Sequence, residues 1–330
     1  MKKLFTLISV VLIAFTAMAQ TLNVQVGNVT YKFPASQTGE MTYSDGTTLT
    51  ILNKAFALSE ISSMTVDNTE VTDGTVGVVY DGTSAKVTVA GNIAQYVTPT
   101  VSGAHVSIAQ SDDLATEITY NLSGSSSDGE FYMSGSYKAT IELNGLTLTN
   151  ATPVNSGAAV HIQDGKRIKV KVVTGTTNTL TDADSGSQKG CLYIKGHAEF
   201  AQKGTLNIVG NKKHGIKTGE YFTIKNATIN VTSAAGDGIN CEQYFLMESG
   251  NITISGTSDD GITVKTTGNG EWDSEDSETK AACGLSCDGN MNISGGTLNL
   301  TATGSGGKGM NRRLCQWRFQ RLAIFLYRRQ

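Results

Sequence analysis

Apolar residues recur at fixed positions along the middle of the chain. Three phrases open on Gly215, Gly238 and Gly284, and each has an aliphatic residue directly after the glycine and apolar residues seven, nine, fourteen and sixteen positions after it. Polar residues such as Thr223 and Asn230 stand between the paired apolar positions. Because side chains alternate between the two faces of a strand, this pattern predicts two short strands in each phrase, each with one buried face.

The spacing between the phrases indicates how they are arranged. Gly215 to Gly238 is a step of 23 residues, and Gly238 to Gly261 is the same step. A repeat of this length, with short strands, glycine turns and no helical spacing, predicts a coil of a parallel β-solenoid. One coil cannot bury its own apolar face, whereas stacked coils bury a continuous column of Ile, Val, Phe and Leu. We therefore predict an all-β fold with coils of about 23 residues.

One interruption divides the last repeats. The stretch between Gly261 and Gly284 contains two coil openings without a pair of apolar strands between them. We predict that residues 264–283 form a loop or hairpin that projects from a single coil. On this alignment Cys241 and Cys287 stack in neighbouring coils, either as free thiols, which we prefer, or as a disulfide, which the strand spacing permits.

The two N-terminal regions have different patterns. Residues 1–19 join a basic start to an apolar run and the Ala17-Met18-Ala19 cleavage pattern, which predicts a signal peptide, since the run is short for a membrane anchor. Residues 20–124 contain stretches of alternating apolar and polar residues, separated by turns, and lack the 23-residue period. We predict that they form a small antiparallel β unit that caps the column. The repeat domain then covers residues 125–311. No later segment predicts a transmembrane span, so we expect an exported protein, located extracellularly, at the cell surface or in the periplasm.

The composition narrows the possible partners. The chain has 330 residues, with 26 Lys+Arg and 29 Asp+Glu and a net charge of −3. A nucleic-acid partner is not expected, because phosphate binding requires a basic face. The five cysteines are too few for a disulfide scaffold, and Cys283 and Cys287 lack the second pair of ligands of a zinc site. We expect a monomer.

Several ordered motifs resemble a known family. The phrases "SGSYKATIELNGLTLTN", "GTTNTLTDA" and "GTLNIVGNKKHGIKTGEYFTI", followed by the "GDGI" coils, are similar to the secreted bacterial carbohydrate-binding β-helix family that binds cellulose and acidic plant-cell-wall polysaccharides. The resemblance covers roughly residues 75–310. It implies a right-handed parallel β-helix akin to calcium-dependent pectate lyases, calcium held by aspartates in the turns, and binding of polygalacturonate-type glycans.

Aspartates at the coil openings are candidate calcium ligands. Asp237 and Asp260 each precede a coil-opening glycine, and Asp259 stands beside the second. Equivalent positions in successive coils lie about 4.8 Å apart, so these carboxylates repel unless a cation such as Ca²⁺ is bound between them. The alternative is that Asp-Gly only forms the turn. Asp288, four residues after its glycine, is a weaker candidate.

Aromatic residues are candidates for contact with sugars. Trp272 lies in the acidic phrase "GEWDSEDSETK", which is either a sugar platform, a second calcium site or a solvated loop. Tyr221 and Tyr244 stand six residues after their glycines, in neighbouring coils. They form either a flat stacking strip for a linear glycan or ordinary cross-strand pairs that stabilise the sheet.

Three function hypotheses follow. The preferred one is a non-catalytic protein that uses calcium to bridge an acidic polysaccharide to an acidic protein surface. The alternative is a calcium-dependent pectate-type lyase with Lys213 or Lys217 as the base, although these lysines are equally surface charge on a coil. A third hypothesis is a structural surface adhesin in which the column is a spacer.

The tail at residues 312–330 departs from the repeat. It contains six arginines, and its sequence fills the expected apolar positions with Arg and Gln. One interpretation is a basic amphipathic capping helix or membrane-surface segment. We favour the other interpretation, a frameshift after about Asn311, because Gly, Thr and Asn vanish from the sequence at this point.

Overall fold

β-Strands are the main regular secondary structure of the described part of the chain. The computed structural model describes residues 20–312, except 40 and 266–289, together with 318–319 and 324–327. In these residues it has 31 strands and two short 3-10 helices, η1 (Ala35–Gln37) and η2 (Gly91–Tyr96). The predicted all-β class is confirmed. Within the described part, no helix is long and apolar enough to cross a membrane.

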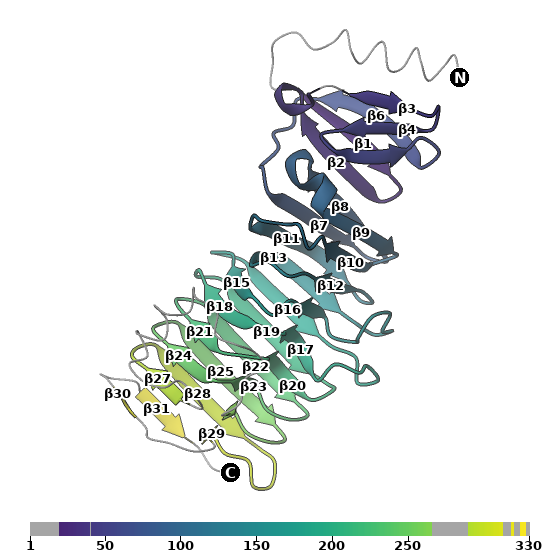
Figure 1. Cartoon of the computed structure of the whole chain (residues 1–330). Helices are drawn as coiled ribbons and strands as arrows, with labels where there is room; N and C mark the ends of the chain where they lie inside the picture. Colours follow the sequence, from purple (N-terminus) through teal and green to yellow (C-terminus); the bar gives the residue numbers. More distant parts are fainter. Residues whose placement is uncertain (1–19, 40, 266–289, 313–317, 320–323, 328–330) are drawn as a thin grey trace.

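The N-terminal group of strands is antiparallel. β1 pairs on one side with β2 and on the other with β6, while β3, β4 and β5 form a separate three-stranded sheet. β2 also pairs in parallel with β8, which joins this group to the large sheet. Figure 1 shows the group at one end of a long stack of strands. The strands are β1 (Thr21–Val26), β2 (Val29–Pro34), β3 (Thr42–Ser44), β4 (Thr48–Ile51), β5 (Lys54–Ala57) and β6 (Ile61–Asp67).

The pairing changes from antiparallel to parallel in the next strands. β7 pairs antiparallel with β8, and β9 with β10, whereas β10 pairs in parallel with β12, and β11 in parallel with β7 and β13. The first parallel strands therefore lie upstream of residue 125. The strands are β7 (Thr75–Asp81), β8 (Ser84–Ala90), β9 (Val97–Ser102), β10 (His105–Gln110), β11 (Ile118–Ser126), β12 (Glu130–Ser134) and β13 (Ala139–Thr149).

From β14 onwards the coils contribute three strands each, and every strand pairs in parallel with its equivalent in the next coil. In the most regular coils the register joins residues 23 positions apart, such as Ile216 with Ile239. The first strands are β14 (Val160–Gln163), β17 (Gly190–Ile194), β20 (His214–Thr218), β23 (Ile239–Glu242) and β26 (Ile262–Lys265). The second are β15 (Arg167–Val172), β18 (His197–Ala201), β21 (Phe222–Ile224), β24 (Tyr244–Met247) and β27 (Asn290–Ile293). The third are β16 (Thr177–Thr181), β19 (Thr205–Gly210), β22 (Thr228–Ala234), β25 (Asn251–Thr257) and β28 (Thr297–Ala302).

The core is a continuous column inside the stack. The apolar positions that alternate with polar ones in each strand are buried in one large cluster that extends through all coils. Phe222 stacks on Phe200 and Phe245, with ring centroids 4.8 and 5.2 Å away. Fully burying one such side chain contributes about 1.5–3 kcal/mol, so the repeated slots stabilise each coil against its neighbours.

The last coils differ from the expected alignment in one respect. β26 and β27 belong to one coil, and the intervening residues 266–289, with most of the expected projecting loop, lie outside the described residues. Cys241 is a buried free thiol, and its partner in the next coil is Val264. The predicted stacking of Cys241 on Cys287 is therefore wrong, because β26 directly follows Gly261; Cys287 itself lies outside the described residues.

The described parts of the tail are strands. β29 (Met310–Arg312) pairs in parallel with β26, and β30 (Arg318–Phe319) and β31 (Ile324–Tyr327) pair in parallel with β27 and β28. The helical interpretation of the tail is wrong for these residues. The frameshift stays a prediction about the gene, which the backbone of the tail does not test.

Candidate functional site

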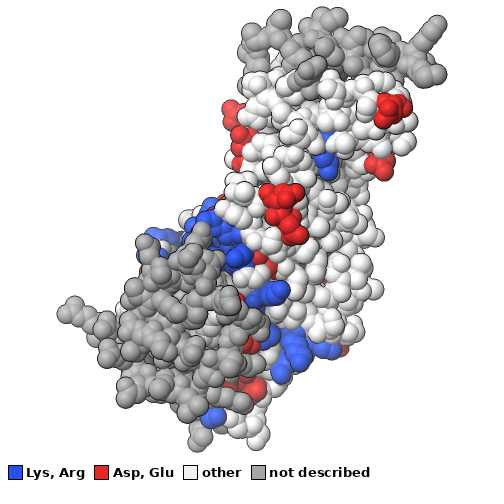
Figure 2. All heavy atoms as spheres, viewed as in Figure 1, with Lys and Arg blue, Asp and Glu red and all other residues white. Residues whose placement is uncertain are grey.

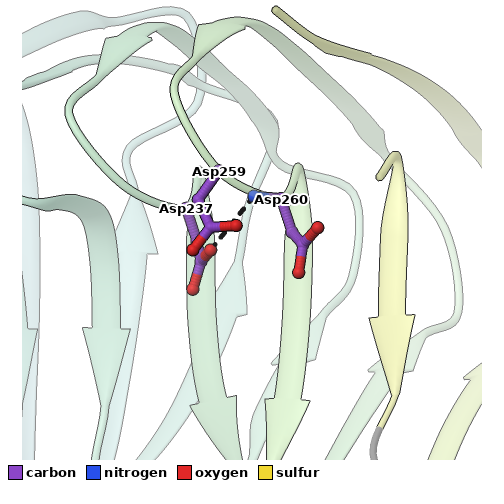
Figure 3. A group of neighbouring side chains, drawn as sticks. All are labelled: Asp237, Asp259 and Asp260. Atoms are coloured by element: carbon purple, nitrogen blue, oxygen red, sulfur yellow. Dashed lines mark hydrogen bonds between the residues drawn. The ribbon is translucent and has the colours of Figure 1, made fainter. Parts of the chain in front are cut away.

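Three carboxylates gather where the chain enters β23 and β26. Asp237 and Asp260, each 3% exposed, immediately precede the glycines that open these strands, and Asp259 is exposed beside them. One carboxylate oxygen from each of the three residues lies within 4.8 Å of the others. Figure 3 shows Asp237 and Asp259 next to each other and Asp260 beside them, where two adjacent strands begin. We call Asp237, Asp259 and Asp260 the acidic cluster.

A ladder of hydrogen bonds fixes this position from coil to coil. The backbone N–H of Asp237 donates to His214 Nδ1 at 3.1 Å, and that of Asp260 donates to Asp237 Oδ1 at 3.2 Å. The N–H of Lys308 donates in turn to Asp260 Oδ1 at 2.8 Å. Each side chain thus satisfies the backbone of the equivalent residue in the next coil, which is the structural role expected of an Asp-Gly turn.

The second oxygen of each buried carboxylate has a side-chain donor. Asn240 Nδ2 donates to Asp237 Oδ2 at 2.6 Å, and Thr263 Oγ1 donates to Asp260 Oδ2 at 3.2 Å. Burial raises the pKa of Asp237, and the nearby charges of Asp259 and Asp260 raise it further. Negative charge is therefore costly here, and the oxygen-rich set has the donor chemistry that a hard divalent cation prefers.

The family of the chain follows from comparison with known proteins. A family model described as "Carbohydrate-binding domain-containing protein" matches residues 102–312, more than half of the chain. The chain belongs to this carbohydrate-binding family. The match includes all three residues of the acidic cluster.

One curated relative carries the same description, and one solved structure shares the fold. A carbohydrate-binding domain-containing protein of Acetivibrio thermocellus is 25% identical over 109 residues, which are 30% of this chain and 37% of that relative. A solved structure of a polysaccharide lyase-like protein from C. thermocellum, in a gadolinium derivative, superposes with a TM-score of 0.52 at 22% identity. It covers 74% of this chain and 96% of that chain, and the likeness shows a shared fold.

Tyr221 and Tyr244 do not form a binding strip in this carbohydrate-binding chain. Their side chains are 0% and 1% exposed, and the rings stack on each other at 4.7 Å with an interplanar angle of 20°. Tyr221 also stacks on His197 at 4.3 Å and donates to Glu199 Oε1 at 3.2 Å. Neither ring has an open face for a sugar, so the predicted stacking strip is wrong and the alternative of stabilising cross-strand pairs holds.

Of the other predicted site residues, the two lysines are described by the structure and two further residues are not. Lys217 Nζ lies 3.3 Å from Asn240 Oδ1 and 3.8 Å from Glu242, so it reaches the acidic cluster through Asn240. Lys213 is exposed and lies one coil before Gly236. The carbonyl oxygen of Lys213 accepts a hydrogen bond from the backbone N–H of Gly236. Trp272 and Asp288 lie outside the described residues.

An aromatic column that the 23-residue period does not reveal lies on the outer side of the first strands. Tyr132, His161 and Tyr193 occupy the same position of β12, β14 and β17. Their steps are 29 and 32 residues, so an alignment based on 23 does not find them. The available signal was the local pattern of one aromatic residue between two apolar ones, in the phrases "FYM", "VHI" and "LYI".

Proposed function

We propose that this chain is an exported, non-catalytic protein that binds an acidic plant-cell-wall polysaccharide with the help of calcium. The observation that carries the proposal is the convergence of Asp237, Asp259 and Asp260, with one oxygen each within 4.8 Å, in a member of a carbohydrate-binding family. The proposal includes a right-handed parallel β-helix, which the parallel coil-to-coil pairing supports, and removal of residues 1–19 as a signal peptide.

The acidic cluster offers the oxygen ligands that calcium prefers. Its Oδ2 atoms accept hydrogen bonds from two neutral donors, Asn240 and Thr263, and His214 Nδ1 lies 3.3 Å from Asp237 Oδ2. A bound calcium ion would supply positive charge to which a uronate carboxylate can also bind. Asp259, which is exposed, would be the protein ligand nearest to such a glycan.

The test measures binding of polygalacturonate by affinity electrophoresis, with calcium and with a chelator. Asp237→Asn and Asp260→Asn remove the charge and keep an oxygen for the backbone N–H of the next coil, and melting temperatures check that both variants are folded. We expect binding in calcium to be about tenfold weaker or more in these variants, while the exposed control Asp81→Asn binds normally. Equal binding with and without calcium, in the wild type and in both variants, would contradict the proposal.

Calcium binding is also measurable without any glycan. At a calcium concentration of 100 times the dissociation constant, the ion should stabilise the folded wild-type protein by about 2.7 kcal/mol. Asp237→Asn should lose most of this stabilisation. If the wild-type melting temperature does not change with calcium, the acidic cluster has only the structural role of its hydrogen-bond ladder.

The second candidate function is a calcium-dependent lyase. It is favoured by the chain of contacts from Lys217 through Asn240 to Asp237, which brings a lysine next to the candidate cation site. A β-elimination produces an unsaturated uronide that absorbs in the ultraviolet. Steady formation of this product by the wild type, and its loss in Lys217→Ala or Lys213→Ala, would replace the binding-only proposal.

A further inference from the structure

The aromatic column of β12, β14 and β17 is an ordered surface. The rings of Tyr132 and His161 lie 4.7 Å apart at 65°, and those of His161 and Tyr193 lie 4.8 Å apart at 81°. Neighbouring residues such as Ile162 point into the core, so the column lies on the outer side of the strands; both tyrosines are partly exposed, whereas His161 between them is buried. These edge-to-face contacts stabilise the column itself.

His161 holds the centre of the column in one orientation. Its Nδ1 is 2.7 Å from Ser156 Oγ, and its Nε2 is 2.9 Å from Gln163 Oε1. The carbonyl oxygen of Gln163 accepts, so Nε2 carries the proton, and Nδ1 accepts from the Ser156 hydroxyl. Burial lowers the pKa of His161, which favours this neutral form. The two tyrosines are therefore supported by a fixed neutral ring.

Exposed lysines border this column on both sides. Lys195 stands two residues after Tyr193, hence on the same face of the chain, and Lys166 lies in the adjoining turn of the preceding coil. Lys189 directly precedes β17, at the other end of the strand from Lys195. All three lysines are exposed. The next residue of the column after Tyr193 is Lys217. We call Tyr132, His161 and Tyr193, with Lys166, Lys189 and Lys195, the tyrosine–lysine face.

The coils around this face are basic although the whole chain is acidic. Residues 160–234 contain 11 Lys+Arg and five Asp+Glu, whereas residues 20–126 contain three and ten. Three of those five acidic residues, Asp164, Asp182 and Glu220, are buried. Figure 2 shows Lys and Arg gathered over the middle coils and Asp and Glu prevailing towards the N-terminal group. A cluster of one sign of charge attracts a polymer of the opposite sign.

We infer that the tyrosine–lysine face binds an acidic polysaccharide directly, without a bridging cation, on the coils that precede the acidic cluster. Aromatic side chains offer faces to sugar rings, and the lysines offer charge to uronate carboxylates. Equivalent positions recur about every 4.8 Å along the stack, which suits a linear polymer lying across several coils. The inference rests on the proposed function for the class of ligand, and it adds a second, calcium-independent contact.

The experiment measures polygalacturonate binding in excess chelator, where the acidic cluster cannot contribute through calcium. We expect residual binding that weakens as sodium chloride is raised, because exposed charge pairs are screened by salt. Lys189→Glu combined with Lys195→Glu should weaken this residual binding by about tenfold. Tyr193→Ala should weaken it with little change in its salt dependence. Melting temperatures confirm that the variants are folded.

The control is Lys86→Glu, an exposed lysine in β8 that changes the net charge without touching the face. Loss of binding in Lys86→Glu equal to that of the face variants would overturn the inference in favour of net charge alone. So would the absence of any chelator-resistant binding, or chelator-resistant binding of a neutral glucan as strong as that of polygalacturonate. Chelator-resistant binding that is unchanged in the face variants would overturn this inference, and calcium-dependent binding that is lost in Asp237→Asn would still leave the proposed function intact.

Discussion

Asp164 gives the sharpest test of the buried electrostatics. Its side chain is 0% exposed, its Oδ1 accepts the N–H of Lys166 at 2.9 Å, and in the described part of the chain its Oδ2 has no hydrogen-bond donor. Gln110 Oε1 also lacks a donor, and both oxygens lie against Gly135, within contact distance of the position of a Cβ there. Both oxygens are acceptors beside Gly135, and protonation of Asp164 would turn its carboxyl into a donor.

The pKa shift sets the size of the effect. Burial raises the pKa of Asp164 from 3.8 to about 6, a difference that corresponds to about 3 kcal/mol. Because the pKa is raised in the folded state, the stabilisation is fully present below the ordinary pKa near 4 and is lost as the pH rises through about 6. The free energy of unfolding should therefore fall by about 3 kcal/mol between pH 4 and pH 7 on account of this residue.

The perturbation is Asp164→Asn, which is neutral at every pH and carries an N–H donor. In urea unfolding at pH 4.5 the variant should be more stable than the wild type by only about 1 kcal/mol, whereas at pH 7.5 it should be more stable by about 3 kcal/mol. Asp81→Asn, at an exposed position, should follow the wild type at both pH values. Parallel pH profiles for Asp164→Asn and the wild type, or a variant that is less stable at pH 7.5, would refute the reasoning.

Three further predictions concern packing. Phe222→Ala removes the central ring of the phenylalanine stack and should lower the free energy of unfolding by about 3–5 kcal/mol, measured in urea; an effect below 1 kcal/mol would contradict the role of the stack. Gly124→Ala forces a side chain against the backbone of Tyr80 at a positive φ of 84° and should cost at least about 1–3 kcal/mol, visible as a lower melting temperature. Cys191 and Cys241 are buried with raised thiol pKa values, so peptide mapping after a thiol reagent should find them unmodified until the chain unfolds; labelling of either in the folded protein would contradict their burial.

The regular coils were predictable because their apolar residues are spaced as the buried positions of each coil are spaced. Each residue at the Ile216 or Phe222 position faces the same column, so the 23-residue step in the sequence corresponds to the register of the ladder. The earlier coils were not predictable in this way, since turns of different length separate Tyr132, His161 and Tyr193 by unequal steps. Strand alternation is local, whereas coil length depends on how each turn packs.

The candidate site was predictable only in part. The adjacency of Asp237 and Asp260 followed from their position before a glycine, but the hydrogen bonds that link them to the next coil depend on backbone orientation, which residue types do not specify. The outward position of Tyr221 and Tyr244 suggested exposure, yet both are covered. The net charge of −3 likewise concealed the basic middle coils, because an average over the chain cancels charges that lie far apart.

The parallel ladders also determine how the molecule would respond to mechanical force. Backbone hydrogen bonds between coils run roughly along the stack, so tension between its two ends loads the bonds lengthwise and can peel coils away singly. A coil of 23 residues released in this way would lengthen the tether by at most about 80 Å. A polymer lying across several coils would bind them together beside the ladder and share the load. Such a chain would resist extension best with the polymer bound. Under rising force it would lengthen coil by coil before it released the polymer.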